Sequence, residues 1–404
     1  MDQNIEKFDV IIIGAGLGGL YVTYLLSKTT LKIAIIEEHK EIGLPFQCAG
    51  IVSQKLSRLI NLPKNIILNR VKVAKIVAPS RKFIKLSGNE QPFIIDRVAL
   101  DRFFYDNVKD NDNITYFLGE KFKSFKYIVD NQQKFVLMKT SKRKLRAKIL
   151  IGCDGPLSLV ARFFGIKNKL LYGTQIRVKS SFNQNEAVMF FDPRWKELFG
   201  WIVPEGSNNI YRIGLASSKN ININFRNFLN KLCINSVEKI DQQGGLIPCG
   251  VMNKLAFDNV LLLGDAAGQV KATTGGGIIM LLIAAKYASY CVQKCFDLDD
   301  YSKKSIKKYY EKPCLSSIGK QIRLHYLIRL IFEKFSNYDF ETFFQIVKSS
   351  KIEEIISLYG DMDFPRSIMV KLLKNSIVIK FLIRFFSKNP LLIIKILTVL
   401  INRY

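Results

Sequence analysis

The first forty residues constrain the fold more than any other part of the chain. Residues 8–26 read FDVIIIGAGLGGLYVTYLL, an apolar strand, a glycine-rich turn and an apolar helix pattern, and LKIAIIEE follows as a second apolar strand. This order is typical of dinucleotide-binding α/β domains. Gly14 is expected to make the tight turn, Gly16 to admit a pyrophosphate, and Gly19 to let helix and strand pack closely. The sequence therefore predicts a dinucleotide site at the start of the first helix.

An acidic residue closes this N-terminal unit. Glu37 ends the second strand, 23 residues after Gly14, where a carboxylate can bind ribose hydroxyls. Gly18 lies in the same turn and is expected to contact the cofactor as well. A glycine turn in another kind of α/β protein is the alternative, but it does not explain why all these features occur in this order.

Two later segments favour FAD over NAD as the dinucleotide. Residues 147–165 contain an apolar strand that ends at Asp154, and residues 258–268 contain another that ends at Asp265. In both segments, a glycine and the start of a helix follow the aspartate. A carboxylate in this position can bind a ribityl hydroxyl of the flavin cofactor, near its pyrophosphate. Helix capping explains each aspartate alone equally well. The two segments together with the N-terminal unit favour a flavin site.

Three consecutive glycines, Gly275 to Gly277, run into an apolar helix pattern that begins near Ile278. Fixing the backbone of glycine costs conformational entropy, so such a run needs a reason. We expect Gly276, Gly277 and Ile278 to lie against the flavin ring, because the N–H groups of a helix start favour the negative charge of a reduced flavin.

These motifs resemble those of the FAD-dependent oxidoreductases built like para-hydroxybenzoate hydroxylase. Within that group, the segments EEHKEIGLPFQCAGIVS (37–53), FGWIVPEG (199–206) and GDAAGQVKATTGGGI (264–278) are similar to the geranylgeranyl reductase family, including archaeal digeranylgeranylglycerophospholipid reductases. The resemblance covers roughly residues 8–290. It implies two-electron reduction of isolated double bonds in isoprenoid chains, with FAD as the carrier. The chain departs from the family where Ala272 replaces a frequent proline and Phe199 a usual tyrosine.

The resemblance also implies roles for residues outside the glycine motifs. It places Cys48 and Ala49, in the sequence PFQCAG, beside the flavin. It also places an arginine of the helical segment 91–108, Arg97 or Arg102, near the flavin nucleotide; a surface ion pair is the alternative for each. No metal ligands are expected.

Cys48 is the candidate proton donor, because saturating an unactivated double bond needs a proton as well as a hydride from reduced flavin. The two histidines, His39 and His325, lie in no motif. A free thiol with the ordinary pKa of about 8.5 is mostly protonated at neutral pH and can donate. A small buried structural cysteine is the alternative.

The segments between the motifs predict an inserted substrate domain. Residues 72–86, 126–150 and 170–250 alternate apolar and polar residues around turns, as antiparallel strands do, with one helix near 224–235. Aromatic residues in the last segment either line an apolar tunnel for an isoprenoid or pack in an ordinary core. They are Phe190, Phe191, Phe199 and Trp201, and the expected substrate-contacting residues are Phe199, Trp201 and Pro204.

The expected fold class is α/β, with a Rossmann-like FAD-binding domain, an inserted antiparallel-sheet substrate domain and a C-terminal helical region. The FAD-binding domain is expected to be discontinuous, in residues 1–75, 97–168 and 252–300. The substrate domain takes residues 76–96 and 169–251, and the helical region takes residues 301–404.

The C-terminal region is expected to associate with membranes. It reads as helices with a break at DMDFP (361–365), and from Arg366 onward it holds eight basic residues and no acidic one among many apolar residues. Such a segment would lie in the membrane interface near anionic head groups. The alternative is an ordinary helical subdomain that covers the sheet.

The net charge of +27 also favours an anionic partner, and the absence of a recognisable nucleic-acid module favours lipid over nucleic acid. Seven scattered cysteines suit a reducing compartment. We expect no signal peptide and no membrane-spanning segment. These features predict a cytoplasmic protein that associates peripherally with membranes.

The sequence thus predicts a flavin enzyme that saturates geranylgeranyl chains of membrane lipids or their precursors. It does not identify the electron donor, for which reduced nicotinamide and ferredoxin are the candidates. One alternative is a flavin monooxygenase that hydroxylates an aromatic or polyprenyl substrate, against which the triple glycine argues. A quinone-linked electron-transfer flavoprotein and a non-enzymatic membrane-binding protein are the others.

Overall fold

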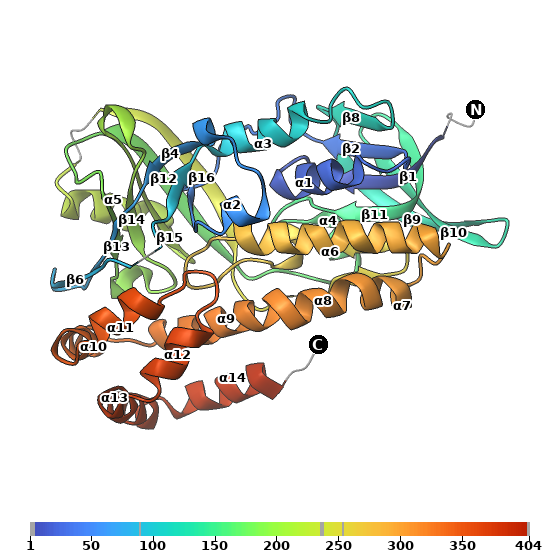
Figure 1. The fold of residues 1–404 in the computed structure, drawn as a ribbon. Helices are drawn as coiled ribbons and strands as arrows, with labels where there is room; N and C mark the ends of the chain where they lie inside the picture. Colours follow the sequence, from blue (N-terminus) through green and yellow to red (C-terminus); the bar gives the residue numbers. More distant parts are fainter. Residues whose placement is uncertain (1–4, 89, 235–237, 253, 402–404) are drawn as a thin grey trace.

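The computed structural model describes residues 5–88, 90–234, 238–252 and 254–401. It confirms the expected α/β class: two large sheets lie end to end, and helices of the C-terminal third lie along one side of both (Figure 1).

The first sheet has a parallel centre in the order β18-β11-β1-β2-β8. These strands are β18 (Val260–Leu262), β11 (Lys144–Gly152), β1 (Glu6–Ile13), β2 (Ile33–Glu37) and β8 (Ile114–Leu118). Antiparallel strands complete it: β17 (Ala256–Phe257) lies beside β18, β10 (Gln133–Thr140) beside β11, and β9 (Phe122–Asp130) beside β10. The central strands are almost continuously apolar because helices cover the sheet and bury both of its faces.

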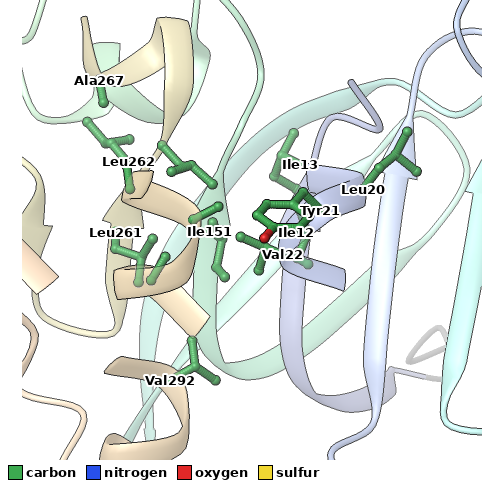
Figure 2. Packing of buried hydrophobic residues seen from close by; sticks show 14 of the residues in the cluster. Ile12, Ile13, Leu20, Tyr21, Val22, Ile151, Leu261, Leu262, Ala267 and Val292 are labelled. Atoms are coloured by element: carbon green, nitrogen blue, oxygen red, sulfur yellow. The ribbon is translucent and has the colours of Figure 1, made fainter. Parts of the chain in front are cut away.

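Helices α1 (Leu17–Leu26) and α6 (Ile278–Asp297) supply much of that cover. Figure 2 shows Tyr21 and Val22 of α1 near Ile12 and Ile151 of the strands, and Val292 of α6 and Leu261 belong to the same core. By length and composition, α6 could cross a membrane, contrary to the expectation from the sequence. Its buried residues pack into this core, as in the core helix of many globular proteins.

The second sheet has the order β16-β12-β15-β14-β13-β5-β6 and is antiparallel except for the pair β13–β5. Its strands are β16 (Lys239–Pro248), β12 (Leu170–Lys179), β15 (Ile210–Ser217), β14 (Gly200–Pro204), β13 (Glu186–Phe190), β5 (Val73–Val77) and β6 (Phe83–Leu86). The expected hairpin in residues 72–86 therefore belongs to this sheet. The strands expected in 126–150 instead extend the first sheet, because β10 pairs with β11.

Shorter elements complete the fold. They are β3 (Ile51–Val52), β4 (Ile67–Arg70), β7 (Phe93–Ile95), α2 (Leu56–Leu59), α3 (Arg97–Asp106), α4 (Leu159–Phe163) and α5 (Ile221–Lys231). The helix expected near 224–235 is α5, which begins and ends earlier; residue 235 lies outside the described residues. The domain limits given above stay a prediction.

The expected helical region is confirmed. Its helices are α7 (Lys303–Ile306), α8 (Lys312–Cys314), α9 (Lys320–Phe332), α10 (Asn337–Ser349), α11 (Ile352–Tyr359), α12 (Arg366–Leu372), α13 (Ser376–Ser387) and α14 (Pro390–Ile401). The segment 361–365 separates α11 from α12, as the sequence predicts. A second apolar core joins these helices to β6 through residues such as Ile84, Phe335 and Phe385.

Candidate functional site

A large cavity of about 1530 Å³ joins the two sheets. One end lies at the carboxyl ends of β1, β2 and β11, where open α/β sheets bind ligands. The other end lies against β12, β13, β14 and β16 of the second sheet. The cavity exceeds the 300–1,000 Å³ typical of small-molecule sites, so it has room for both a dinucleotide and a second molecule.

The glycines of the N-terminal turn divide into two kinds. A side chain at Gly19 would place its Cβ 2.0 Å from the carbonyl oxygen of Gly14, and one at Gly14 would come 2.5 Å from that of Cys153. Gly14 also has a φ of +98°, which disfavours other residues. By contrast, a Cβ at Gly16 would meet nothing within 4 Å, and Gly16 lines the cavity. Gly14 and Gly19 are thus required for packing, whereas Gly16 leaves the cavity open.

Gly18, in the same turn, faces helix α6. Its Cβ position lies 2.9 Å from the Leu281 side chain, so this glycine lets α6 approach α1 as well as lining the cavity.

Glu37 lines the cavity at the end of β2. One carboxylate oxygen accepts a hydrogen bond of 2.8 Å from the backbone N–H of Ala15, and the other accepts one of 2.9 Å from the N–H of His39. These bonds fix the carboxylate beside the glycine turn, where a ribose hydroxyl is expected.

Asp154 and Asp265 both line the cavity, but their carboxylates differ. Asp154 accepts hydrogen bonds from the Ser158 hydroxyl and from the N–H groups of Leu159 and Val160. The capping alternative therefore holds for Asp154, since its carboxylate anchors the start of α4. No side chain in the described ranges donates a hydrogen bond to the Asp265 carboxylate. Burial raises the pKa of Asp265 to about 6, although Arg97 opposes this shift.

We predict that Asp265→Asn stabilises the FAD-free protein at neutral pH. Because the ordinary pKa of 3.8 is raised to about 6 by folding, the carboxyl favours the folded state below pH 4 and loses this contribution as pH rises to 6. The variant should gain about 3 kcal/mol relative to wild type above pH 6 and nothing below pH 4. Thermal unfolding between pH 4 and 8 measures this difference, and a difference that does not change with pH would contradict the prediction.

The triple glycine lies in the wall of the cavity between its two ends. Gly275, Gly276, Gly277 and Ile278 line the cavity, and α6 begins at Ile278 with Gly277 as its N-cap, as expected. Gly275 has a φ of +69°. No side chain caps the helix start, so a ligand in the cavity would meet this backbone without intervening side chains.

Arg97 lines the cavity, whereas Arg102 is not among its lining residues. Arg97 donates hydrogen bonds to the Asp101 carboxylate at 2.9 and 3.1 Å. Its Nε is buried without a hydrogen-bond partner. Arg102 is exposed and lies 3.9 Å from Glu41, so the surface-pair alternative is correct for Arg102.

Cys48 and Ala49 line the cavity and are held by side chains of the second sheet. Gln175 Nε2 donates to the carbonyl of Cys48 at 3.0 Å, and Arg212 donates to the carbonyl of Ala49 at 2.9 Å. The Cys48 sulfur accepts a hydrogen bond of 3.3 Å from the N–H of Gly50. These bonds fix the thiol where the two ends of the cavity meet. Neither Gln175 nor Arg212 lies in a motif that would have predicted this role.

The second sheet supplies the apolar end of the cavity. Phe199 and Trp201 line it, and the indole N–H of Trp201 donates to Gln175 Oε1 at 3.2 Å. Pro204 is not among the lining residues; its carbonyl accepts a hydrogen bond from Asn69. The tunnel hypothesis is wrong for two other aromatics: Phe190 packs on Phe228, and Phe191 packs on Phe199, Phe332 and Phe340.

The sequence did not predict a third wall, formed by residues 356–363 and Ile368. The Lys271 ammonium, beside the triple glycine, lies 2.6 Å from the Asp363 carboxylate, and Asp363 is fully buried. Lys55 donates to Asp361 at 2.9 Å. Two buried or half-buried ion pairs thus fasten the segment between α11 and α12 to the rest of the cavity.

Neither His39 nor His325 is placed to donate a proton at the apolar end of the cavity. His39 lines the nucleotide end and contacts Glu37 at 2.6 Å. His325 lies outside the lining, between Thr273 and the carbonyl of Asp363, and burial lowers its pKa to about 4.

Known proteins are similar to this chain in sequence and in fold. A family model described as an NAD(P)-binding Rossmann-like domain matches residues 12–54. An uncharacterized protein of Methanocaldococcus jannaschii is 26% identical over 92% of this chain and 96% of its own length. Digeranylgeranylglycerophospholipid reductase 3 of Methanosphaera stadtmanae is 29% identical over 87% of this chain and 94% of its own length.

Solved structures extend the likeness to the whole fold. A geranylgeranyl bacteriochlorophyll reductase-like protein of Thermoplasma acidophilum has a TM-score of 0.80 at 21% identity, covering 95% of this chain and 100% of its own. A mutant of the halogenase PltM in complex with FAD has a TM-score of 0.65 at 15% identity, covering 90% of this chain and 85% of its own. Together these matches confirm the resemblance to the geranylgeranyl reductase family that the motifs indicate.

Proposed function

We propose that this protein is an FAD-dependent oxidoreductase that reduces isolated C=C bonds in geranylgeranyl chains of membrane lipids or their precursors. One observation carries the proposal: a single cavity runs from the glycine turn to the apolar wall of the second sheet, with a cysteine thiol and a bare helix start between them. A cofactor and an isoprenoid chain can therefore meet without leaving the protein.

The nucleotide end fits FAD. The side of Gly16 is open to the cavity, the Asp265 carboxylate lacks a side-chain donor within the described ranges, and the Nε of Arg97 is buried without a partner. Such groups are expected to be satisfied by a ligand. Gly14, Gly16, Glu37 and Asp265 would hold the cofactor, with the helix start at Ile278 facing the flavin. Bound FAD, when reduced, supplies a hydride to one carbon of the double bond.

The chain itself supplies the proton and the environment. The Cys48 thiol would give its proton to the second carbon of the double bond, and the resulting thiolate would regain a proton from water. Gln175 and Gly50 hold the thiol loop in place. Phe199 and Trp201 would exclude water from the apolar chain, since both lie in the cavity wall.

The test is the mass of the product. The FAD-loaded protein, reduced chemically and mixed with a geranylgeranyl lipid, is expected to raise the lipid mass in steps of two hydrogens. A gain of oxygen would instead establish the monooxygenase alternative, and an unchanged lipid with rapid flavin reoxidation by a quinone would establish the electron-transfer alternative.

Helices α13 and α14 carry the proposed membrane surface. They bury Val378, Phe381, Phe385 and Leu392, so they are in part the ordinary subdomain weighed as the alternative. Other apolar residues on them stay exposed, including Ile383 (64%), Leu391 (79%) and Ile401 (72%). Such an apolar and basic surface suits the interface of an anionic bilayer.

We predict that neutralising this surface weakens membrane binding. The quadruple variant Lys380→Gln, Arg384→Gln, Lys388→Gln and Lys395→Gln should lose about 1 kcal/mol per charge on anionic vesicles. Added salt should weaken wild-type binding without abolishing it, because the apolar side chains still insert. Vesicle flotation with anionic and zwitterionic lipids measures this, and equal flotation of both proteins on anionic vesicles would mean that these helices are ordinary scaffold.

A further inference from the structure

A second, shallower hollow lies beside the cavity. It is a groove of about 770 Å³ between the end of α11 and one face of α12. The groove and the cavity share Leu358, Gly360 and Asp361, so the two hollows adjoin at this short segment. A molecule in the groove would be next to the wall that closes the apolar chamber.

Three basic residues line this groove: Arg366, Lys371 and Lys374. Arg366 is the first residue of α12, Lys371 lies near its end, and Lys374 lies just beyond it, and all three border the groove. Among the residues that the structure describes, no carboxylate lies within ion-pair distance of any of them. Lys371 lies over the Tyr359 ring, 3.7 Å from its centroid, which holds its ammonium at the groove.

The acidic residue in the groove does not cancel this charge. Asp361 accepts hydrogen bonds from Lys55 at 2.9 Å and from the N–H groups of Asp363 and Phe364. Its Oδ1 is thus already paired with Lys55 and with two backbone N–H groups. The groove is left with three cationic side chains and an exposed apolar border that includes Leu358 and Val370.

We infer that this groove is a phosphate-binding subsite that holds the head of the lipid substrate while its isoprenoid chain occupies the cavity. Arg binds phosphate through a planar fork and Lys as a point charge, so the three residues match a phosphate group. The apolar border matches the first carbons that follow it. The inference rests on the proposed function, because it assumes that the cavity receives a prenyl chain.

Phosphate could come from a glycerophospholipid head group, from a prenyl diphosphate or from the free anion, and the experiment separates these sources. The test variant is Arg366→Gln, Lys371→Gln and Lys374→Gln in the full-length, FAD-loaded protein. The matched control, Lys123→Gln, Lys126→Gln and Lys139→Gln, removes the same charge from exposed positions on β9 and β10, which lie at the opposite end of the molecule (Figure 1).

The kinetic arm uses detergent-dispersed substrates with and without phosphate. For the test variant, we expect KM to rise roughly 10- to 100-fold for a prenyl glycerophospholipid, a prenyl diphosphate or both, and not for the prenyl alcohol. Which of the two responds identifies the source. A rise that includes the alcohol, no rise at all, or the same rise in the control variant would overturn the inference.

The binding arm needs no turnover. A short-chain glycerophospholipid, kept below its micelle concentration, should bind the wild type and the control alike and bind the test variant roughly 10- to 100-fold more weakly. Binding of inorganic phosphate without the lipid would assign the groove to the free anion. Normal lipid binding with slower reduction by an acidic electron-transfer protein would assign it to that partner. If wild type binds the lipid but reduces no prenyl substrate, the proposed function fails while the phosphate site stands.

Discussion

Gly16→Val is expected to give a folded protein without FAD. The Cβ position of Gly16 has no neighbour within 4 Å, so a branched side chain there disturbs no contact of the polypeptide. It would instead fill the part of the cavity at the start of α1, where the phosphates of a dinucleotide approach the backbone most closely. The purified variant should be colourless, with an unfolding temperature near that of FAD-free wild type.

Gly19→Ala provides the contrast, because the Cβ position of Gly19, unlike that of Gly16, is packed against the polypeptide. Its Cβ would lie 2.0 Å from the Gly14 carbonyl oxygen, so this variant should be destabilised before any cofactor is added. Circular dichroism and flavin absorbance after FAD titration distinguish the two effects. A yellow Gly16→Val protein with wild-type affinity for FAD would show that the dinucleotide lies elsewhere.

Cys48→Ala is expected to keep FAD and to slow the reaction about 10²- to 10⁴-fold, the usual cost of losing a general acid. The loop that carries the thiol should survive, because its anchors are backbone carbonyls of Cys48 and Ala49 that accept from Gln175 and Arg212. The measurement is the rate at which a prenyl substrate reoxidises the chemically reduced flavin in a stopped-flow instrument.

Cys249→Ala is the matched control for this experiment. Cys249 follows β16 of the second sheet and is buried, but it is not among the residues that line the cavity. Its variant should react at the wild-type rate. Wild-type turnover in Cys48→Ala would assign Cys48 to a structural role and leave the proton donor to be sought among the other lining residues.

The parts of the site that the sequence predicted are those encoded in short segments. The glycine turn, Glu37 at the end of β2 and the helix start at Ile278 each follow from a strand or helix pattern within about twenty residues. The alternation in residues 72–86 likewise predicted the hairpin β5–β6. It could not tell which sheet a hairpin joins, because strand pairing depends on distant partners.

The choice between Arg97 and Arg102 shows a similar limit. The two lie five residues apart on α3, which places them on different faces of the helix, but the sequence does not say which face meets the cavity. Burial decides it: Arg97 pairs with the buried Asp101, whereas Arg102 is exposed. Gln175, Arg212 and Lys271 were missed for a related reason, since Cys48, Ala49 and Asp363, which they bind in the cavity wall, each lie more than ninety residues away in the chain.

The ion pair between Lys271 and Asp363 has a consequence for how the protein is made. The glycine turn leaves the ribosome early, but the cavity wall that includes Asp363 follows it by about 350 residues. At 5–20 residues per second this interval is about 20 to 70 seconds. During that time the first sheet can form while the cavity still lacks one wall. Nascent chains, and fragments left by premature termination, should therefore retain FAD poorly, so that stable flavin colour marks a polypeptide whose synthesis has finished.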